Sequence, residues 1–251
     1  MLDGKVAFVT GGSGAIGSAV VRAFAREGCR VAFSYHSHED QARKLVEECN
    51  SGGGGVDGVG EKVRAYPLDV LDAKACQSLA ETVEREFGRV DVLVNNAGIA
   101  QIMPFAMIDE KDWDLVMDVN VKGMFLVTKA FARGMIRRKG GSIINMSSLA
   151  GLRVLEVPVH YATAKSAVVG FTLSLAGELG RYNIRVNAIV PGMLTGGVSA
   201  NIPARQQEKY KDFCSLSRAG EPAEVAELAA FLASDRSSYI NAQSIFVDGG
   251  I

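Results

Sequence analysis

Two side chains four positions apart carry the clearest chemical signal in the chain. Tyr161 and Lys165 bracket the segment Tyr-Ala-Thr-Ala-Lys, which opens a stretch with helical periodicity. A spacing of four residues puts both side chains on one face of a helix. A tyrosine hydroxyl has a pKa of about 10, and a nearby ammonium group lowers that pKa toward the range of proton exchange at neutral pH. Taken alone, the pair also fits a half-buried tyrosine packed over the aliphatic stem of a lysine.

Polar residues that follow two predicted strands favour the chemical interpretation. Ser147 and Ser148 come directly after an apolar strand at 142–146, and Asn-Asn-Ala-Gly at 95–98 ends the preceding strand. The carboxyl ends of parallel strands meet at one edge of a sheet, which is where such sheets bind ligands. We therefore expect these residues to line a site at that edge.

A glycine-rich turn predicts a phosphate-binding site near the start of the chain. Residues 10–17 read Thr-Gly-Gly-Ser-Gly-Ala-Ile-Gly between the first predicted strand and the first predicted helix. Glycine lets the backbone approach a pyrophosphate, and the amides and dipole of the helix N-terminus favour its negative charge. Dinucleotides bind at the first such unit of a parallel sheet, although a tight turn without a ligand is the alternative. The expected cofactor contacts in this turn are Gly11, Ser13, Gly14, Ala15 and Ile16.

The end of the second predicted strand bears on the choice of dinucleotide. A carboxylate about 20 residues after the turn would bind a ribose 2′-hydroxyl. Residues 33–38 read Phe-Ser-Tyr-His-Ser-His instead, and the first carboxylate is Glu39. Without that acid a 2′-phosphate is not repelled, and Ser34 and the histidines could donate hydrogen bonds to it. We predict NADP(H) over NAD(H), with Tyr35 and His36 at the cofactor, although no arginine stands there to clamp the phosphate. Solvated loop histidines are the alternative.

Strands and helices alternate along the whole chain. Short apolar runs predict strands at 6–10, 31–34, 63–66, 90–94, 142–146, 186–190 and 244–247. Helical periodicity predicts helices at 16–27, 39–49, 74–87, 110–137, 161–180 and 222–233. This order predicts an α/β fold, a single-domain Rossmann-type doubly wound parallel sheet of about seven strands with helices on both faces.

We expect one catalytic domain over residues 1–251. The glycine-rich stretch at 51–60 is expected to be a surface loop. Two glycines followed by a polar helical stretch predict a substrate lid around 195–213, and a plain surface insertion is the alternative.

Composition excludes several classes of protein. The chain has 251 residues, 48% of them hydrophobic, and a formal net charge of -1, which gives no electrostatic reason to expect nucleic acid or an anionic membrane as a partner. Its four cysteines form no C-x-x-C pair and stand near no histidine cluster, so we expect reduced thiols and no metal site. The absence of a signal-peptide pattern and of a long apolar run predicts a cytoplasmic protein without a membrane span.

The chain resembles the short-chain dehydrogenases/reductases over essentially its whole length. The motifs that carry the resemblance are the turn at 10–17, Asp69, Asn-Asn-Ala-Gly at 95–98, Asn120, Ser148 thirteen positions before Tyr161, Tyr-x-x-x-Lys, Pro191-Gly192 and Val-Asp-Gly-Gly at 247–250. Two positions depart from the family pattern. Ala15 replaces a glycine of the turn, and Thr195 comes one place earlier than in many members, which puts its contact with a carboxamide in doubt.

The resemblance implies an oxidoreductase with a tetrad of Asn120, Ser148, Tyr161 and Lys165. In that scheme Ser148 binds the substrate oxygen and Tyr161 gives the proton, while Lys165 holds the ribose and lowers the tyrosine pKa. Asn120 supports a water that relays protons. The further implied cofactor contacts are Asp69, Val70, Asn96, Ala97 and Gly98 on the adenosine side and Pro191, Gly192 and Leu194 on the nicotinamide side, together with Tyr161 and Lys165. The resemblance also implies a homotetramer.

Within that family the chain looks most like the 3-oxoacyl-[acyl-carrier-protein] reductases. Leu152, Val154, Leu155 and Val157 suit an acyl chain. Basic residues at 137–139 and Arg181 could form a rim for an acidic carrier protein, although cations also suit a helix end. The alternatives are an alcohol, steroid or sugar dehydrogenase and a non-catalytic dinucleotide-binding protein.

Overall fold

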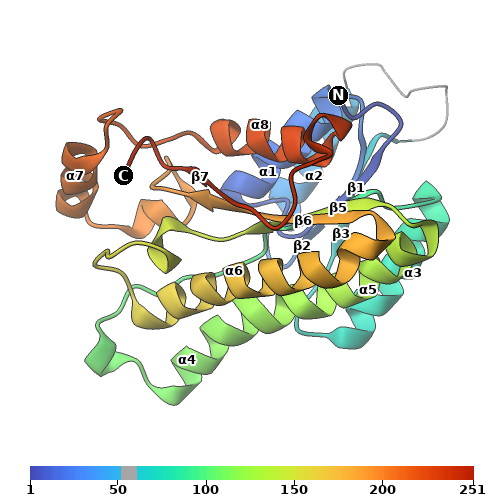
Figure 1. The fold of residues 1–251 in the computed structure, drawn as a ribbon. Helices are drawn as coiled ribbons and strands as arrows, with labels where there is room; N and C mark the ends of the chain where they lie inside the picture. Colours follow the sequence, from blue (N-terminus) through green and yellow to red (C-terminus); the bar gives the residue numbers. More distant parts are fainter. Residues whose placement is uncertain (52–60) are drawn as a thin grey trace.

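Seven parallel strands form one sheet through the middle of the molecule (Figure 1). The computed structural model describes residues 1–51 and 61–251, so most of the loop expected at 51–60 lies outside the described residues. The strands are β1 (Val6–Val9), β2 (Arg30–Tyr35), β3 (Val63–Pro67), β4 (Val92–Asn95), β5 (Gly141–Met146), β6 (Ile184–Pro191) and β7 (Ser244–Val247). Their order is β3-β2-β1-β4-β5-β6-β7, and every neighbouring pair is parallel. The predicted doubly wound sheet is confirmed.

Helices cover both faces of the sheet. They are α1 (Ala15–Arg26), α2 (Glu39–Asn50), α3 (Ala73–Phe87), α4 (Glu110–Met117), α5 (Gly123–Arg138), α6 (Val159–Leu179), α7 (Ala204–Phe213) and α8 (Pro222–Ala233). Residues of α1, α2 and α8 share one hydrophobic core with the sheet, and residues of α3, α5 and α6 share the other. Figure 1 shows α1 and α8 on one side of the strands and α5 and α6 on the opposite side.

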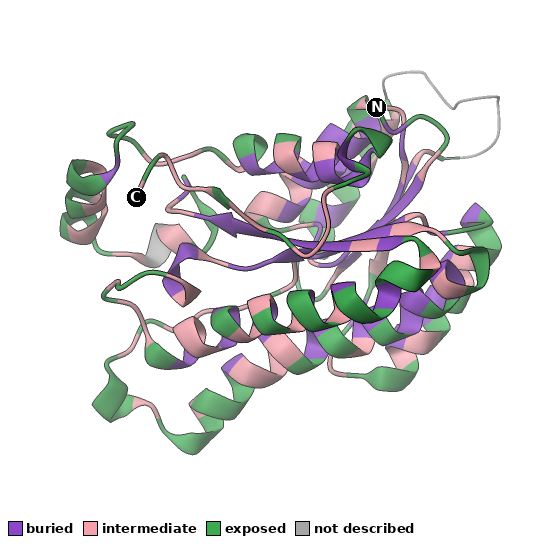
Figure 2. Cartoon of the chain, in the orientation of Figure 1, coloured by how far each residue is buried: buried purple, intermediate pink, exposed green. Residues whose placement is uncertain are grey.

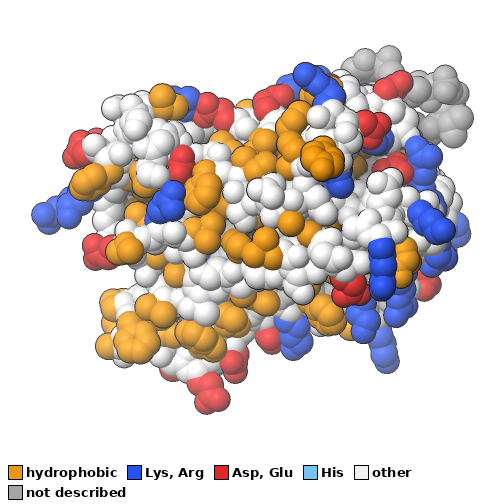
Figure 3. All heavy atoms as spheres, viewed as in Figure 1, with side chains coloured by type: hydrophobic (Ala, Val, Ile, Leu, Met, Phe, Trp, Pro, Cys, Tyr) orange, Lys and Arg blue, Asp and Glu red, His pale blue; other side chains and the backbone are white. Residues whose placement is uncertain are grey.

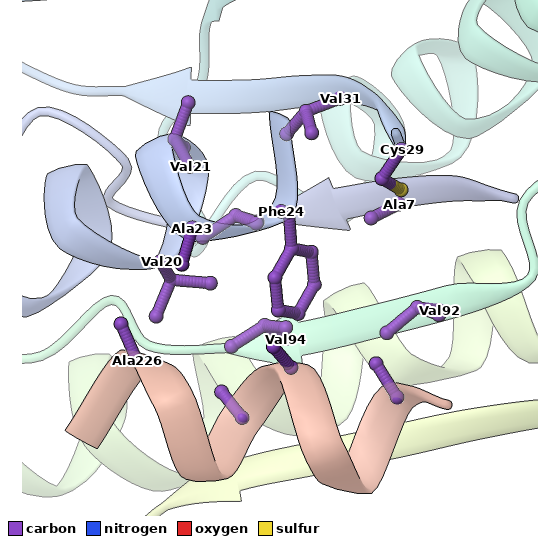
Figure 4. Packing of buried hydrophobic residues seen from close by; sticks show 14 of the residues in the cluster. Ala7, Val20, Val21, Ala23, Phe24, Cys29, Val31, Val92, Val94 and Ala226 are labelled. Atoms are coloured by element: carbon purple, nitrogen blue, oxygen red, sulfur yellow. The ribbon is translucent and has the colours of Figure 1, made fainter. Parts of the chain in front are cut away.

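The central strands are apolar at almost every position because each supplies both cores. Ala7 and Val9 face the first core, whereas Val6 and Phe8 face the second. In the first core the ring of Phe24 lies beside Val94 (Figure 4). Figure 2 shows these strands as the buried layer of the molecule. Two-sided burial explains why these runs lack the polar alternation of a half-exposed strand.

The helix expected at 110–137 is helical throughout but irregular in its middle. Five residues, Asp118–Lys122, form a π-helical turn between α4 and α5. Within this turn the Asn120 side chain donates to the Val116 carbonyl at 2.9 Å, which is the acceptor that a regular helix offers to the backbone amide of residue 120. The π-helical turn, which the periodicity did not predict, sets Asn120 apart from its neighbours. The helix expected from 161 begins earlier, at Val159.

The segment expected to be a lid contains a short 3-10 turn, Gly197–Asn201, and then α7. No residue of α7 is buried, so few side-chain contacts attach it to the body. No helix in residues 1–51 or 61–251 is both long enough and apolar enough to cross a membrane.

A buried chain of polar side chains ties the second helical layer to the sheet. Asn95 donates to Thr128 and to Asn145, both at 2.8 Å, and Asn145 donates to Thr172 at 2.9 Å. These groups come from β4, α5, β5 and α6 in turn. Buried hydrogen bonds of this kind contribute most to stability because water cannot replace them. The four linked side chains therefore fix the position of α6 on the sheet.

Replacing the middle of this chain should destabilise the protein. We expect Asn145→Leu to lower the free energy of unfolding by about 1–3 kcal/mol, because it removes two buried hydrogen bonds, one from Asn95 and one to Thr172, at little change in volume. Urea denaturation followed by circular dichroism measures this change. Thr172→Val, which removes only the last partner, should cost less, and equal stability of Asn145→Leu and wild type would contradict the role of the chain.

Candidate active site

The loop after β5 is clamped to α6 by its own polar groups. Ser147 is buried, and its hydroxyl donates to the Lys165 carbonyl at 2.8 Å. The Ser166 hydroxyl donates to the Gly151 carbonyl at 2.5 Å. A β-carbon on Gly151 would lie only 2.6 Å from the Ser166 backbone nitrogen, so the close approach requires glycine. These contacts fix the position of Ser148 relative to the first turns of α6.

The structure separates the roles of the two serines. The Ser147 hydroxyl is used in the clamp, whereas the Ser148 hydroxyl accepts from the Ala150 amide at 3.2 Å. Burial raises the pKa of the Tyr161 phenol above its usual value, and the neighbouring Ser148 hydroxyl acts in the opposite direction. Without a cofactor the net direction is upward, so the phenol holds its proton and is ready to donate it.

Lys165 is buried between the sheet and α6. Its ammonium group donates to the Met146 carbonyl at 3.0 Å and lies 5.7 Å from the centre of the Tyr161 ring. Burial lowers its pKa from 10.5 to about 8. The expected lowering of the Tyr161 pKa by Lys165 is not seen in the structure, where burial raises that pKa instead.

Asn120 reaches the same place from the π-helical turn. Its amide group donates to the carbonyls of Ile99 and Val116, both at 2.9 Å, while its buried side-chain oxygen has no protein partner. Gly98 lies between Asn120 and Lys165, since a β-carbon there would be 2.5 Å from the Asn120 side-chain oxygen and 3.3 Å from the Lys165 ammonium. An unused acceptor beside an ammonium donor suits a bound water. The structure thus brings all four expected tetrad residues together.

The glycine-rich turn lies at the same edge of the sheet and is braced by the end of β4. Asn96 donates to the carbonyls of Thr10 and Gly11, at 2.9 and 3.1 Å, and the Thr10 hydroxyl accepts from the Asn96 and Ala97 amides, both at 2.9 Å. Asn96 therefore holds the turn through its side chain. Sequence reasoning missed the part played by Thr10, although its place at the end of an apolar strand was a signal.

The turn has the shape that a pyrophosphate requires. Gly11 has a φ of +64°, and a β-carbon on Gly17 would meet the Gly11 carbonyl at 2.2 Å. Gly14 precedes α1 without a side-chain cap, which leaves the first amides of the helix for a ligand. Ser13, Ala15 and Ile16 are half-buried around this helix start. These residues fit a dinucleotide phosphate.

The expected adenosine-side residues follow the neighbouring strands β2 and β3. Tyr35 ends β2 half-buried, and His36 is exposed beside it. Asp69 is exposed and accepts from the Leu71 amide at 2.9 Å, with Val70 buried next to it. Ser34, in contrast, is buried, and its hydroxyl accepts from the Gly11 amide at 3.4 Å. Our expectation that Ser34 serves a phosphate was therefore wrong, because it supports the turn instead.

The chain continues from the carboxyl end of β6 through Pro191, Gly192 and Leu194, at the same edge of the sheet as the glycine-rich turn. Gly197 beyond them approaches the turn, since a β-carbon there would be 3.2 Å from the Ala15 side chain. The hydroxyl of Thr195 donates to the Glu221 carboxylate at 2.6 Å. Thr195 therefore has a hydrogen-bond partner within the protein. This agrees with the departure of its position from the family pattern.

The basic residues expected at the mouth of the site lie elsewhere. Arg137 and Arg138 end α5 and form ion pairs with Glu84, at 2.9 and 3.2 Å. The chain enters β5 directly after them, so they stand at the amino edge of the sheet, opposite Ser148. Figure 3 shows lysine and arginine side chains gathered at the end of the molecule remote from α7. Within one chain they form no rim around the site.

His160 is a neighbour of Tyr161 that sequence reasoning did not place in the site. It is fully buried, its Nδ1 accepts from the Tyr161 amide at 2.9 Å, and its Nε2 has no protein partner. Burial lowers its pKa, against a smaller opposing effect of Asp112. Among the residues that the structure describes, no group of three or more His, Cys, Asp and Glu side chains could hold a metal ion.

The burial of Lys165 should cost stability. Its pKa is about 8 in the folded protein and about 10.4 in an unfolded chain, so the unfolded state holds the proton more tightly and stability rises as the pH increases from 8 to 10.4. We expect cofactor-free Lys165→Met to melt at a higher temperature than wild type at pH 7, with a smaller difference near pH 10. Differential scanning calorimetry measures both, with Lys44→Met on the exposed face of α2 as control. A lower melting temperature for Lys165→Met at pH 7 would contradict this prediction.

Comparison with known proteins identifies the family to which the chain belongs. Residues 11–251 match a family model described as "Enoyl-(Acyl carrier protein) reductase". The chain is 40% identical to 3-oxoacyl-[acyl-carrier-protein] reductase FabG of Thermotoga maritima, over 100% of this chain and 98% of that protein, and 36% identical to D-threitol dehydrogenase of Mycolicibacterium smegmatis, over 99% and 93%. A solved short-chain dehydrogenase/reductase mutant from Serratia marcescens superposes with a TM-score of 0.90 at 35% identity, over 99% of this chain and 98% of that one. The chain therefore belongs to the short-chain dehydrogenase/reductase family.

Proposed function

We propose that the protein reduces the carbonyl carbon of a 3-oxoacyl thioester, carried on acyl carrier protein, with NADPH. The proposal rests on the side chains that share one site, those of Ser148, Tyr161, Lys165 and Asn120. Beside them lies the glycine-rich turn, and the helix that follows it has no side-chain cap. All four tetrad members are present, which argues against a non-catalytic dinucleotide-binding protein.

Bound NADPH would supply the hydride for the carbonyl carbon. The Ser148 hydroxyl, whose oxygen accepts from the Ala150 amide, can donate its proton to the carbonyl oxygen and so orient it. Tyr161 holds its proton in the buried site and donates it to that oxygen as negative charge develops there. Lys165 then favours the phenolate, and a water at the unpaired oxygen of Asn120 returns a proton through Lys165.

The preference for NADPH is supported by the residues beside the ribose. Tyr35 and His36 end β2 where an acid would bind a 2′-hydroxyl, and the first carboxylate, Glu39, begins α2. The end of β2 itself therefore lacks the carboxylate that would bind a 2′-hydroxyl and repel a 2′-phosphate. Free thiols at all four cysteines support a reducing compartment, so we propose the cytoplasm.

The exposed apolar side chains around the cleft support an acyl substrate. Ile102, Phe105 and Met107 follow β4, Val154 follows β5, and Phe213 ends α7, all of them at least half exposed. Figure 3 shows hydrophobic side chains clustered over this end of the molecule, around α4 and α7. Apolar surface at the rim of a cleft is typical of a ligand site. A polyol remains the second candidate, because D-threitol dehydrogenase is among the relatives and Arg153 stands in the same loop.

A direct assay tests the reaction. We expect reduction of an acetoacetyl thioester with NADPH, at a much higher kcat/KM than with NADH, and a loss of about 10²–10⁴ in turnover for Tyr161→Phe with NADPH binding unchanged. Absorbance at the nicotinamide band measures turnover, and fluorescence titration measures binding. Tyr239→Phe, at a fully exposed tyrosine, is the control. Turnover of D-threitol but not of the thioester would favour the second candidate, and near-normal activity of Tyr161→Phe would refute the assigned role.

We also propose a homotetramer. The groove between α5 and α6 is lined by Phe125 and Lys129 from one helix and Phe171 and Ser174 from the other, and Phe125 is 44% exposed. An exposed aromatic ring in a groove between two long helices suits a second copy of the chain.

Light scattering after size-exclusion chromatography tests the assembly. We expect a particle of four chains, and we expect Phe125→Glu to shift it to smaller species, since it buries a charge at the interface. Because Phe125 is exposed in one chain, the variant should keep its helical circular dichroism. A wild-type monomer at micromolar concentration would overturn the proposal.

A further inference from the structure

The ladder between β6 and β7 ends in a bridge made by a side chain from α7. The last backbone hydrogen bond of the pair runs from the Gly192 amide to the Val247 carbonyl at 2.9 Å. At the next position the Tyr210 hydroxyl accepts from the Met193 amide at 3.0 Å and donates to the Asp248 carbonyl at 3.1 Å. One phenol thus joins the two chains where their direct pairing stops.

Gly192 makes room for this bridge. A β-carbon at position 192 would lie 2.1 Å from the Tyr210 hydroxyl and 2.9 Å from the Asp248 α-carbon. The backbone φ of Gly192 is not in the left-handed region, so the requirement for glycine here is one of space. The Tyr210 ring is half-buried, and burial raises the pKa of its phenol, so the hydroxyl remains a donor at neutral pH.

The bridge connects α7 to distant parts of the chain, whereas the Gln207 side chain of the same helix donates to the nearby Ser199 and Ile202 carbonyls at 3.5 and 2.7 Å. None of its ten residues is buried, and Phe213 at its end is 77% exposed. Beyond the helix, Ser215 and Leu216 pair with Gly250 and Gly249 through their backbones. Tyr210 is therefore the point at which α7 itself contacts both the segment after β6 and the C-terminal residues.

The segment after β6 is held from its other side by Gly220. The Gly220 amide donates to the Met193 carbonyl at 3.0 Å, and the Thr195 amide donates to the Gly220 carbonyl at 2.8 Å. Two hydrogen bonds thus hold Met193: its carbonyl accepts from Gly220, and its amide donates to Tyr210. The backbone path through Leu194 and Thr195 follows from these contacts.

We propose that Tyr210 is a positioning residue that couples α7 to the cofactor-facing segment 191–195. While α7 stays in place, the Tyr210 hydroxyl holds the Met193 backbone, and when α7 moves away, the amide of Met193 and the carbonyl of Asp248 lose this partner to water. The helix α7 and the segment 191–195 therefore move together. This inference rests on the proposed function for the assignment of segment 191–195 to the cofactor.

The variant Tyr210→Phe tests the coupling, because it removes the hydroxyl and keeps the ring. We expect amide hydrogen exchange at Met193 in the cofactor-free protein to become about tenfold faster, and the dissociation constant for NADPH to rise about fivefold to tenfold, the effect of losing one net hydrogen bond. Exchange along the rest of β6 should stay as in wild type. Tyr239→Phe, which removes an exposed hydroxyl, should change neither quantity.

Two results would overturn the inference, and a third would contradict the proposed function on which it rests. Unchanged exchange at Met193 and unchanged NADPH affinity in Tyr210→Phe would refute the positioning role. Exchange that rises equally along β6 and β7 would show a general loss of stability and would also refute it. A wild-type protein that binds neither NADPH nor NADH would contradict the proposed function, whereas the exchange at Met193 would still decide whether Tyr210 holds the segment.

Discussion

Ser147 and Gly151 hold the first turns of α6 against the end of β5, and the distances within the site follow from that attachment. Ser147 binds the backbone at Lys165, and the absence of a side chain at Gly151 lets the loop touch Ser166. Ser148 stands between these two contacts, so it cannot shift relative to Tyr161 without breaking them. The buried polar chain through Asn145 and Thr172 fixes the same helix farther along. A reactive geometry of a few ångströms is thus built on hydrogen bonds from side chains to the backbone and on close packing of the backbone at Gly151.

The site gains its chemical properties at the expense of stability. The ammonium group of Lys165 is buried and donates to the Met146 carbonyl, and burial lowers its pKa to about 8. The same burial raises the pKa of Tyr161 and leaves the Asn120 oxygen without a partner. Such groups are costly in a folded protein unless a ligand or water satisfies them. Their concentration at one edge of the sheet is what distinguishes this region from the two apolar cores.

The cofactor side of the cleft uses residues that also support the fold. Asn96, Thr10 and Ser34 all bind the backbone of the glycine-rich turn, so the turn keeps its shape before any ligand arrives. Across the cleft, Gly197 approaches Ala15, and Tyr210 secures the chain that leads to it. A preformed phosphate turn opposite a lightly attached helix suits a site that must admit and release a large cofactor.

Local sequence determined the elements, because apolar runs and helical periods report directly which faces must be buried. The seven strands, the start of α2 and the full extent of α8 could be predicted for this reason, and the spacing from Ser148 to Tyr161 indicated the tetrad. Only the tertiary structure decided matters that depend on partners distant in the chain. It showed that Arg137 and Arg138 pair with Glu84 at the far edge and that Thr195 pairs with Glu221. It also showed the π-helical turn in which Asn120 takes the Val116 carbonyl. The Tyr210 bridge is of the same kind, since hydrogen bonds between segments 17 and 38 residues apart leave no periodic trace in the sequence.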